Sequence, residues 1–392
     1  MQKTPDKIEK TPWGLVLALW GAGLGAAAQY GKFSAIFDQL PQVYPQAGAA
    51  LGFVVSVVGL LGIFFGVAAG LIVARVRYRR ALLWALWIGA AISAFQAFLP
   101  PLSWMLASRA LEGLSHLAVV VAAPTLIAQI CAPRDRGVAL TLWGTFFGVA
   151  FTVLAWAGLP LVAWLGIPAL LAAHALYLVI FAIYLGRRLQ ALEIDPVVPP
   201  FSMRQLLRDH LTIYRSPSIS APAFGWLFYT FCFVSILTVL PPFIAEPSRA
   251  FVMGAMPLTS IAVSMILGVA LLRVMTAVSV IVLGFVGSAL TMVWLWVAPG
   301  DPVACLVLAG AMGLVQGASF AAVPQLNRTP DTQAQANGAL AQMGNVGNTL
   351  GTPVMAVTAT ALGYGGLPVL AGCAFVLGAC VHLVLARQRR HA

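Results

Sequence analysis

Three ionisable residues lie on one face of a hydrophobic segment, and their types could bind an ion and move a proton. Arg109, Glu112 and His116 are spaced i, i+3 and i+7, which places all three on the same side of an α-helix. The segment around them, residues 103–131, is apolar enough to lie in a bilayer. A charged side chain near the middle of a membrane costs at least ~2.5–3.5 kcal/mol. We therefore expect these side chains to face a protein interior or a water-filled path.

Each of the three residues has a functional and a structural interpretation. Arg109 could hold an anion, Glu112 could load and release a proton, and His116 could extend a proton relay. Alternatively, Glu112 neutralises Arg109 as a structural pair, and His116 is hydrogen-bonded within a helix bundle. Two isolated histidines in other apolar segments, His174 and His382, are interpreted as packing residues.

Lys32 is a second cation inside an apolar segment, residues 13–37. Counted from the cytoplasmic end of this segment, it lies roughly 10 Å beyond the middle at 1.5 Å per residue. Arg109 lies at a similar depth in its own segment, so the two cations could form an anion-binding pair. The alternative is that Lys32 extends to the outer membrane interface with Asp38 as its partner.

Further candidates for substrate contact are polar and aromatic residues in other apolar segments. Gln342, Asn345 and Asn348 recur at every third position and form a polar stripe, for which hydrogen bonds between helices are the alternative role. Aromatic side chains could line the same cavity, although packing and the aromatic belts at the membrane surfaces account for most such residues. Besides the two cations, the predicted substrate contacts are Gln29, Tyr30, Trp226, Tyr229, Gln316, Asn345 and Asn348.

The composition is that of an integral membrane protein. Of the 392 residues, 61% are hydrophobic and 8% are charged, with a mean hydropathy of +0.94. A soluble domain carries roughly 25% charged residues. The five cysteines have no C-x-x-C or metal-ligand spacing. Because no hydrolase, zinc-protease, Walker or dinucleotide motif is present, we expect neither an enzyme nor a bound cofactor or metal.

Hydropathy predicts an all-α polytopic membrane protein with twelve membrane-spanning helices. A polar linker, residues 187–220, separates two bundles of six helices, 13–186 and 221–386. Within this linker, residues 202–215 could form an amphipathic helix on the inner membrane surface or remain a flexible connection. The expected spans are residues 13–37, 47–74, 81–99, 103–131, 137–157, 161–186, 221–245, 250–272, 275–298, 302–327, 333–362 and 365–386.

Lys and Arg residues are distributed unevenly between the two ends of these spans. With the N-terminus in the cytoplasm, nineteen lie on the cytoplasmic side and one, Arg249, lies outside. The positive-inside rule therefore places the linker and both tails, residues 1–12 and 387–392, in the cytoplasm. The net charge of +11 follows from this topology and is no evidence for a nucleic-acid partner.

The two halves carry a weak internal repeat. Glu112-Gly-Leu-Ser in the fourth expected span corresponds to Gln316-Gly-Ala-Ser in the tenth, at an offset of 204 residues. Repeated six-helix halves with a substrate between them near the midplane are a common plan of transporters. We therefore expect the two bundles to be pseudo-symmetric, with the intramembrane charges confined to the first.

Over nearly its full length the sequence resembles the major facilitator superfamily of secondary transporters. The loop from Gly70 through Arg75 and Arg79 resembles the G-x-L-A-D-R-x-G-R-K loop of that family. Two departures are clear, because Ala74 replaces the acidic residue and Arg77 replaces the second glycine. The acidic residue helps to latch the two halves in the family, so the resemblance implies a conformational role for the loop but not this latch.

A second motif, Arg109-x-x-Glu112-Gly113, resembles the R-x-x-Q/E-G segment that lines the transport cavity in many members of the family. Among its subfamilies, the chain resembles small bacterial organic-anion or cyanate/nitroimidazole-type carriers. The resemblance implies alternating access in a bacterial inner membrane, and we expect a monomer.

The intramembrane charges favour an anionic substrate. Lys32, Arg109 and Glu112 sum to +1 when all are ionised, so an anion lowers the cost of burying them and a cation raises it. We expect proton symport of a small organic anion, with the anion, protons and the lipid bilayer as partners. The alternatives are a drug–proton antiporter that exports lipophilic compounds and a transporter-like solute sensor.

Overall fold

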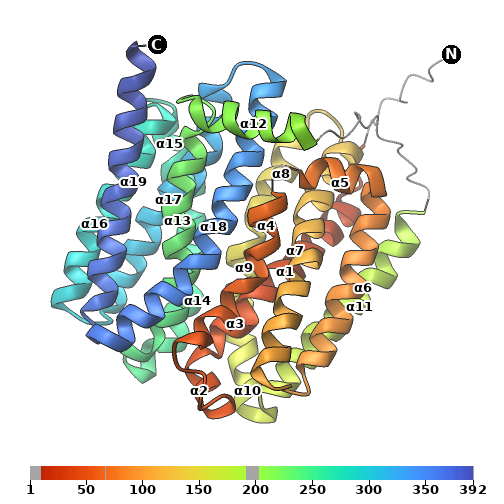
Figure 1. Ribbon diagram of the computed structural model, residues 1–392, viewed down its shortest axis with the longest axis vertical. Helices are drawn as coiled ribbons and strands as arrows, with labels where there is room; N and C mark the ends of the chain where they lie inside the picture. Colours follow the sequence, from red (N-terminus) through yellow and green to blue (C-terminus); the bar gives the residue numbers. More distant parts are fainter. Residues whose placement is uncertain (1–9, 67, 191–202, 392) are drawn as a thin grey trace.

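The structure is a computed structural model that describes residues 10–66, 68–190 and 203–391. These residues form helices and no strand. Figure 1 shows two groups of helices side by side, the first half of the chain in red to yellow-green and the second in green to blue. The all-α fold class predicted from hydropathy is confirmed.

The first half contains long continuous helices and several helices that 3₁₀ or π turns interrupt. Its elements are α1 (Trp13–Ala35), η1 (Phe37–Gln39), α2 (Leu40–Val43), η2 (Gly48–Ala50), α3 (Leu51–Ser56), η3 (Val57–Gly59), α4 (Leu60–Phe65), α5 (Ala69–Val76), α6 (Tyr78–Gln96), α7 (Leu102–Ile130), α8 (Arg136–Gly144), α9 (Phe146–Val153), the π-helix η4 (Leu154–Gly158), α10 (Leu159–Leu165) and α11 (Ile167–Arg188).

The second half follows a short linker helix. The elements are α12 (Met203–Arg215) in the linker, then α13 (Ala221–Val239), η5 (Pro241–Phe243), α14 (Glu246–Val263), the π-helix η6 (Ser264–Gly268), α15 (Val269–Leu272), α16 (Ala277–Val297), α17 (Pro302–Leu326), α18 (Pro330–Leu362) and α19 (Gly366–His391).

Nine helical runs among the described residues are long and apolar enough to cross a membrane. Three further helices, α1, α6 and α18, occupy the positions of the other expected spans. They are less apolar because α1 contains Gln29 and Lys32, α6 begins with arginines, and α18 carries the polar stripe. In α1 and α18, polar side chains within the helix thus reduce the hydropathy that identifies a membrane span, and in α6 the arginines of the first turn do so.

Two predicted boundaries differ from the structure. The sequence predicts separate spans over residues 137–157 and 161–186, but helical structure continues through α10, and the turn falls at Gly166. Gly166 has a φ of +82°, which glycine adopts without strain. The expected span 47–74 is likewise divided, because the 3₁₀ turn η3 interrupts it at residues 57–59.

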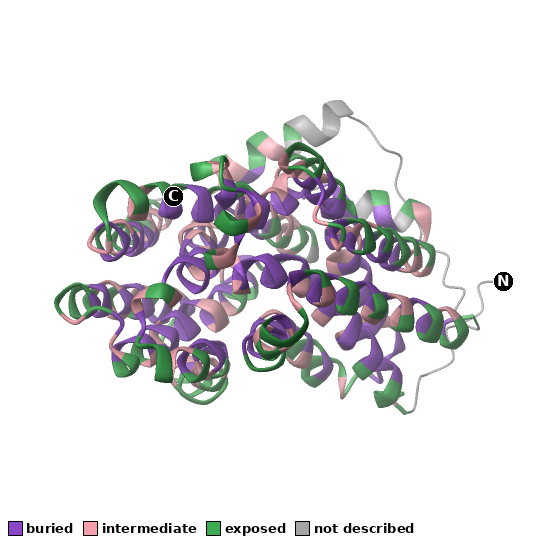
Figure 2. Ribbon diagram, turned by 90° about the horizontal axis from the view of Figure 1, so that it is seen from below, coloured by how far each residue is buried: buried purple, intermediate pink, exposed green. Residues whose placement is uncertain are grey.

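Exposed apolar side chains cover the outside of the molecule. Figure 2 shows buried residues on the inner faces of the helices and along the seam between the two groups, with exposed residues around the perimeter. Phe98 and Trp164 are among the most exposed, at 84% and 88%. A surface of this kind suits lipid rather than water.

The two halves touch along matching pairs of helices. Ser34 Oγ of α1 is 2.7 Å from Thr238 Oγ1 of α13. Thr152 Oγ1 of α9 donates to Gly254 O of α14 at 2.9 Å. In addition, α3 and α4 pack along α18. The seam is therefore closed at several points in this state.

The linker helix α12 lies across one end of the bundles (Figure 1). Tyr214 Oη donates to Gln342 Oε1 at 2.6 Å, and Gln342 Nε2 donates to Ile63 O at 2.7 Å. Burial raises the pKa of Tyr214 to about 12, so its hydroxyl remains a donor at neutral pH. Gln342 of the polar stripe thus joins α12 to both α4 and α18.

Reporter fusions test the topology that the charge distribution predicts. The elements α5, α8, α12 and α15 share one end of the molecule, and α2 and α10 lie at the other (Figure 1). Because the first end carries most of the basic residues, fusions after residues 190 and 392 should report cytoplasm. A fusion after residue 300 should report the outside. A C-terminal reporter on the outside would contradict the twelve-span topology.

Candidate functional site

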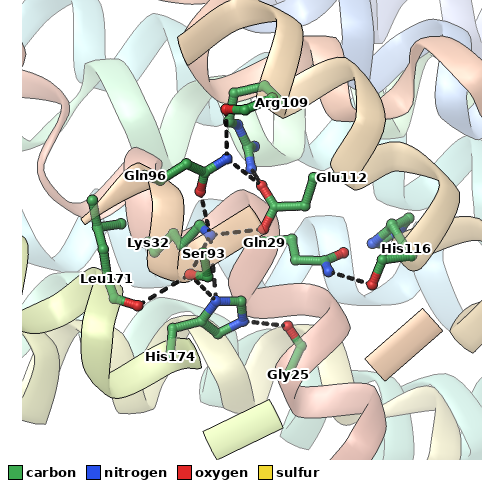
Figure 3. A network of polar contacts seen from close by, with 12 residues as sticks. Gly25, Gln29, Lys32, Ser93, Gln96, Arg109, Glu112, His116, Leu171 and His174 are labelled. Carbon is green, nitrogen blue, oxygen red and sulfur yellow. Dashed lines mark hydrogen bonds and ion pairs between the residues drawn. The ribbon is translucent and has the colours of Figure 1, made fainter. Parts of the chain in front are cut away.

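The structure brings Lys32, Arg109 and Glu112 into direct contact inside the first half (Figure 3). All three side chains have 0% exposure. Glu112 Oε1 lies 2.7 Å from Lys32 Nζ, and Glu112 Oε2 forms an ion pair with Arg109 Nη1. The Glu112 carboxylate is therefore the counter-ion of both cations. The three residues together carry a net charge of +1 when all are ionised.

These contacts distinguish between the alternatives for Lys32. Its side chain faces the interior of the bundle and pairs with Glu112, so it does not extend to the outer membrane interface. Asp38, the partner required by that alternative, is exposed in η1. Lys32 is thus a buried cation of α1 beside the charged face of α7.

The Arg109 guanidinium also binds the backbone of α3. Its Nε donates to Val54 O at 2.7 Å, and its Nη2 donates to Val55 O at 3.0 Å. Both carbonyls lie just before η3, where 3₁₀ turns disturb the i→i+4 bonding of the helix and leave carbonyls for other donors. Each guanidinium nitrogen has a partner in this state, so any further ligand of Arg109 would have to replace one of these contacts.

Lys32 is held by polar side chains from two further helices. Its Nζ donates to Gln96 Oε1 at 2.8 Å and to Ser93 Oγ at 3.0 Å, both from α6. It also lies 3.3 Å from Nδ1 of His174 in α11. His174 Nε2 lies 2.9 Å from Gly25 O, which can only accept, so we assign the imidazole proton to Nε2. Nδ1 is then an acceptor that suits an ammonium neighbour.

Four members of this network were not predicted as site residues: Ser93, Gln96, Ser108 and His174. Gln96 connects α6 to α7. Its Nε2 donates to Glu112 Oε2 at 3.0 Å and to Ser108 Oγ at 3.1 Å, both on α7. Ser93 and Gln96 are polar residues at i, i+3 in an apolar span, which is a signal that could have identified them. The interpretation of His174 as a packing residue is wrong, since both ring nitrogens have polar partners.

His116 shares a helix with Glu112 but binds elsewhere. Its Nδ1 lies 3.0 Å from Ala26 O, and its ring meets Tyr30 edge-on with centroids 5.1 Å apart. Next to it, Gln29 Nε2 donates to Ser115 Oγ at 2.8 Å. This arrangement favours a structural hydrogen bond over a relay for His116.

Of the predicted contacts in the second half, Trp226, Tyr229 and Gln316 lie together. Tyr229 Oη donates to Gln316 Oε1 at 3.2 Å, and the rings of Trp226 and Tyr229 stack with centroids 4.5 Å apart. Asn345 Nδ2 donates to Ala341 O of its own helix at 2.9 Å. Asn348 is half-buried one turn further along α18.

A chain of aromatic rings connects the two groups across the seam. Tyr30 is 5.8 Å from Phe147 between ring centroids, Phe147 is 6.3 Å from Phe233, and Phe233 is 5.5 Å from Tyr229. Phe147 belongs to the first half and Phe233 to the second. The predicted aromatic residues Tyr30 and Tyr229 therefore stand at the two ends of one continuous wall.

The predicted conformational loop joins α5 and α6. Gly70 and Arg75 lie in α5, and Arg79 lies in the first turn of α6. Arg77 between the helices has a φ of 73°, a conformation that favours glycine. The family motif has glycine at this position, a residue that adopts this conformation without strain.

The long apolar helices and the apolar outer surface are those of a polytopic membrane protein. A family model described as Major Facilitator Superfamily matches residues 15–273, more than half of the chain. The chain therefore belongs to the major facilitator superfamily and is a membrane transporter. A comparison with curated proteins finds no match. Within the ranges that the structure describes, no group of three or more His, Cys, Asp or Glu residues could hold a metal ion.

Removal of the shared carboxylate should destabilise the protein strongly. Glu112→Ala leaves Lys32 and Arg109 buried without a counter-ion, and breaking a buried ion pair costs about 3–5 kcal/mol. Thermal unfolding in detergent should show a clear decrease in Tm for Glu112→Ala. The double variant Lys32→Met with Glu112→Gln should show a smaller decrease in Tm, because it leaves only one buried cation without a counter-ion instead of two. Asp38→Asn, which changes an exposed carboxylate, is the control. An equal decrease in Tm for Glu112→Ala and Asp38→Asn would contradict the assignment of Glu112 as the shared counter-ion.

Proposed function

We propose that this transporter carries a small organic anion across the membrane together with a proton, by alternating access between its two halves. The observation that supports the proposal is the fully buried group of Lys32, Glu112 and Arg109, in which two cations share one carboxylate. A group with excess positive charge attracts an anion and repels a cation when both are removed from water.

The substrate reaches this group through the seam between the halves. Arg109 donates to carbonyls of α3, and α3 packs against α18 of the second half. Movement of α3 away from α18 exposes the Arg109 side of the network. The polar residues Gln316 and Tyr229 then face the substrate from the opposite half.

Glu112 is the proton carrier in this mechanism. The substrate anion and the Glu112 carboxylate compete for the same two cations, so a bound anion displaces the carboxylate and the carboxylate takes up a proton. Protonation of Glu112 in turn releases the cations for the substrate. Linkage makes this effect reciprocal. The site then has the same net charge empty and loaded, which suits reorientation in both states.

Loss of either cation should weaken binding of the transported anion. Charge-assisted hydrogen bonds contribute about 1.5–3 kcal/mol, so Lys32→Ala and Arg109→Ala should each reduce affinity by roughly ten- to a hundredfold. Lys32→Arg should be partly tolerated, whereas Arg109→Lys should not, because the planar fork on Val54 and Val55 is lost.

The measurement is uptake of labelled short carboxylates into proteoliposomes. Lys10→Ala changes an exposed cation and is the matched control. Normal uptake by Lys32→Ala would show that Lys32 has a structural role and that Arg109 acts without it.

Glu112→Gln should separate exchange from accumulation. The amide imitates the protonated carboxyl, so this variant should bind substrate and exchange it across the membrane by counterflow. It should fail to concentrate substrate when only a pH gradient is applied, because no proton can be released. Glu246→Gln, at an exposed carboxylate of α14, is the control. Accumulation by Glu112→Gln under a pH gradient would remove Glu112 as the coupling residue.

A further inference from the structure

Four hydroxyl groups are buried between the two halves without a protein partner. They belong to Tyr30 in α1, Ser56 in α3, and Thr349 and Thr352 in α18, and each residue is at most 5% exposed. A buried hydroxyl that lacks a hydrogen bond is destabilising. Four of them at one contact between helices therefore require an explanation.

Several other buried hydroxyls among the described residues are satisfied within their own helices. They donate to the carbonyl four residues earlier, which is the usual solution for serine and threonine in apolar helices. Such bonds are made by Thr238, Ser288, Thr291 and Ser319. The hydroxyls of Thr349, Thr352 and Ser56 do not form this bond, so they are available to a partner outside their helix.

Gly59 marks the point to which two of the hydroxyls are directed. A Cβ atom added at Gly59 would lie 2.5 Å from both Tyr30 Oη and Thr349 Oγ1. A Cβ atom added at Gly52 would likewise lie 2.6 Å from Pro353 Cα of α18. Ser56 lies about one helical turn from each of these two glycines, on the same face of α3 and η3. The hydroxyls thus lie along a strip where glycines of the second expected span let α1 and α18 approach its backbone closely.

This strip adjoins the charged network. Arg109 binds the carbonyls of Val54 and Val55, the two residues that precede Ser56. The Arg109 guanidinium carbon also lies 4.7 Å from the centroid of Phe33, which shares a face of α1 with Tyr30 at i, i+3. Ser56 therefore follows directly in sequence the two carbonyls that hold Arg109.

We propose that the hydroxyls of Tyr30, Ser56, Thr349 and Thr352 form a second subsite that hydrogen-bonds an uncharged polar group of the substrate. The transported anion is then a short carboxylate that also carries a hydroxyl group, rather than a purely aliphatic one. A hydroxyl of the substrate both donates and accepts, so it can satisfy several of these groups at once. This inference rests on the anion transport proposed above and specifies its substrate class.

Matched pairs of carboxylates test the subsite. Binding of lactate and propionate, and of malate and succinate, is measured with the purified full-length protein by titration calorimetry. The wild type should bind the hydroxylated member of at least one pair roughly three- to tenfold more tightly, which is the value of one net hydrogen bond. Tyr30→Phe and Thr349→Val should each bring this ratio close to one.

Two control variants are available in the same chain. Thr360→Val removes a hydroxyl of α18 that is already bonded to Ala356 O at 2.9 Å, and it should keep the wild-type preference. Gly59→Ala places a methyl group between Tyr30 and Thr349 and should abolish the preference, whereas Gly144→Ala meets no atom within 4 Å and should not.

The possible failures of the two proposals differ. If both members of each pair bind equally and binding still depends on Arg109, water alone satisfies the hydroxyls and the subsite is refuted while anion transport stands. A preference that survives in Tyr30→Phe and Thr349→Val also refutes the subsite. If no carboxylate binds in an Arg109-dependent manner, both proposals fail.

Discussion

The burial of charge is the constraint on which the rest of this structure depends. Lys32 and Arg109 come from different helices, and each is costly to bury without a negative partner. Glu112 meets both of them, so a single carboxylate compensates two cations incompletely. In the proposed mechanism, the remaining positive charge attracts the anion. The substrate and a proton then compete for the same groups, and this competition couples their transport.

The surrounding helices are arranged to satisfy these charges. α6 contributes Ser93 and Gln96, α11 contributes His174, and α3 contributes two backbone carbonyls at an interruption of its helix. That interruption connects the network to the seam, because the same broken segment packs its glycines against α18. The segment that binds Arg109 through its carbonyls is therefore also the segment that packs on α18. The proposed mechanism uses this segment both for substrate recognition and for movement of the two halves.

The sequence predicts those features that local spacing determines. The i, i+3 spacing brings Arg109 and Glu112 together, as expected for one helical face. The same face did not determine the partner of His116, because contacts with Ala26 and Tyr30 on α1 depend on how two helices pack. His174 is isolated in its sequence segment, and only tertiary structure brings it to Lys32. The break in the second expected span was also beyond prediction, since apolar residues continue through it.

The central claim is that a bound anion displaces Glu112 from its cations, and proton uptake on binding tests it most directly. The purified transporter is mixed with a saturating carboxylate in weakly buffered detergent solution that contains a pH indicator. We expect the wild type to take up close to one proton per bound anion, and Glu112→Gln to bind the anion without proton uptake. Binding by the wild type without proton uptake, or equal uptake by Glu112→Gln, would contradict the account.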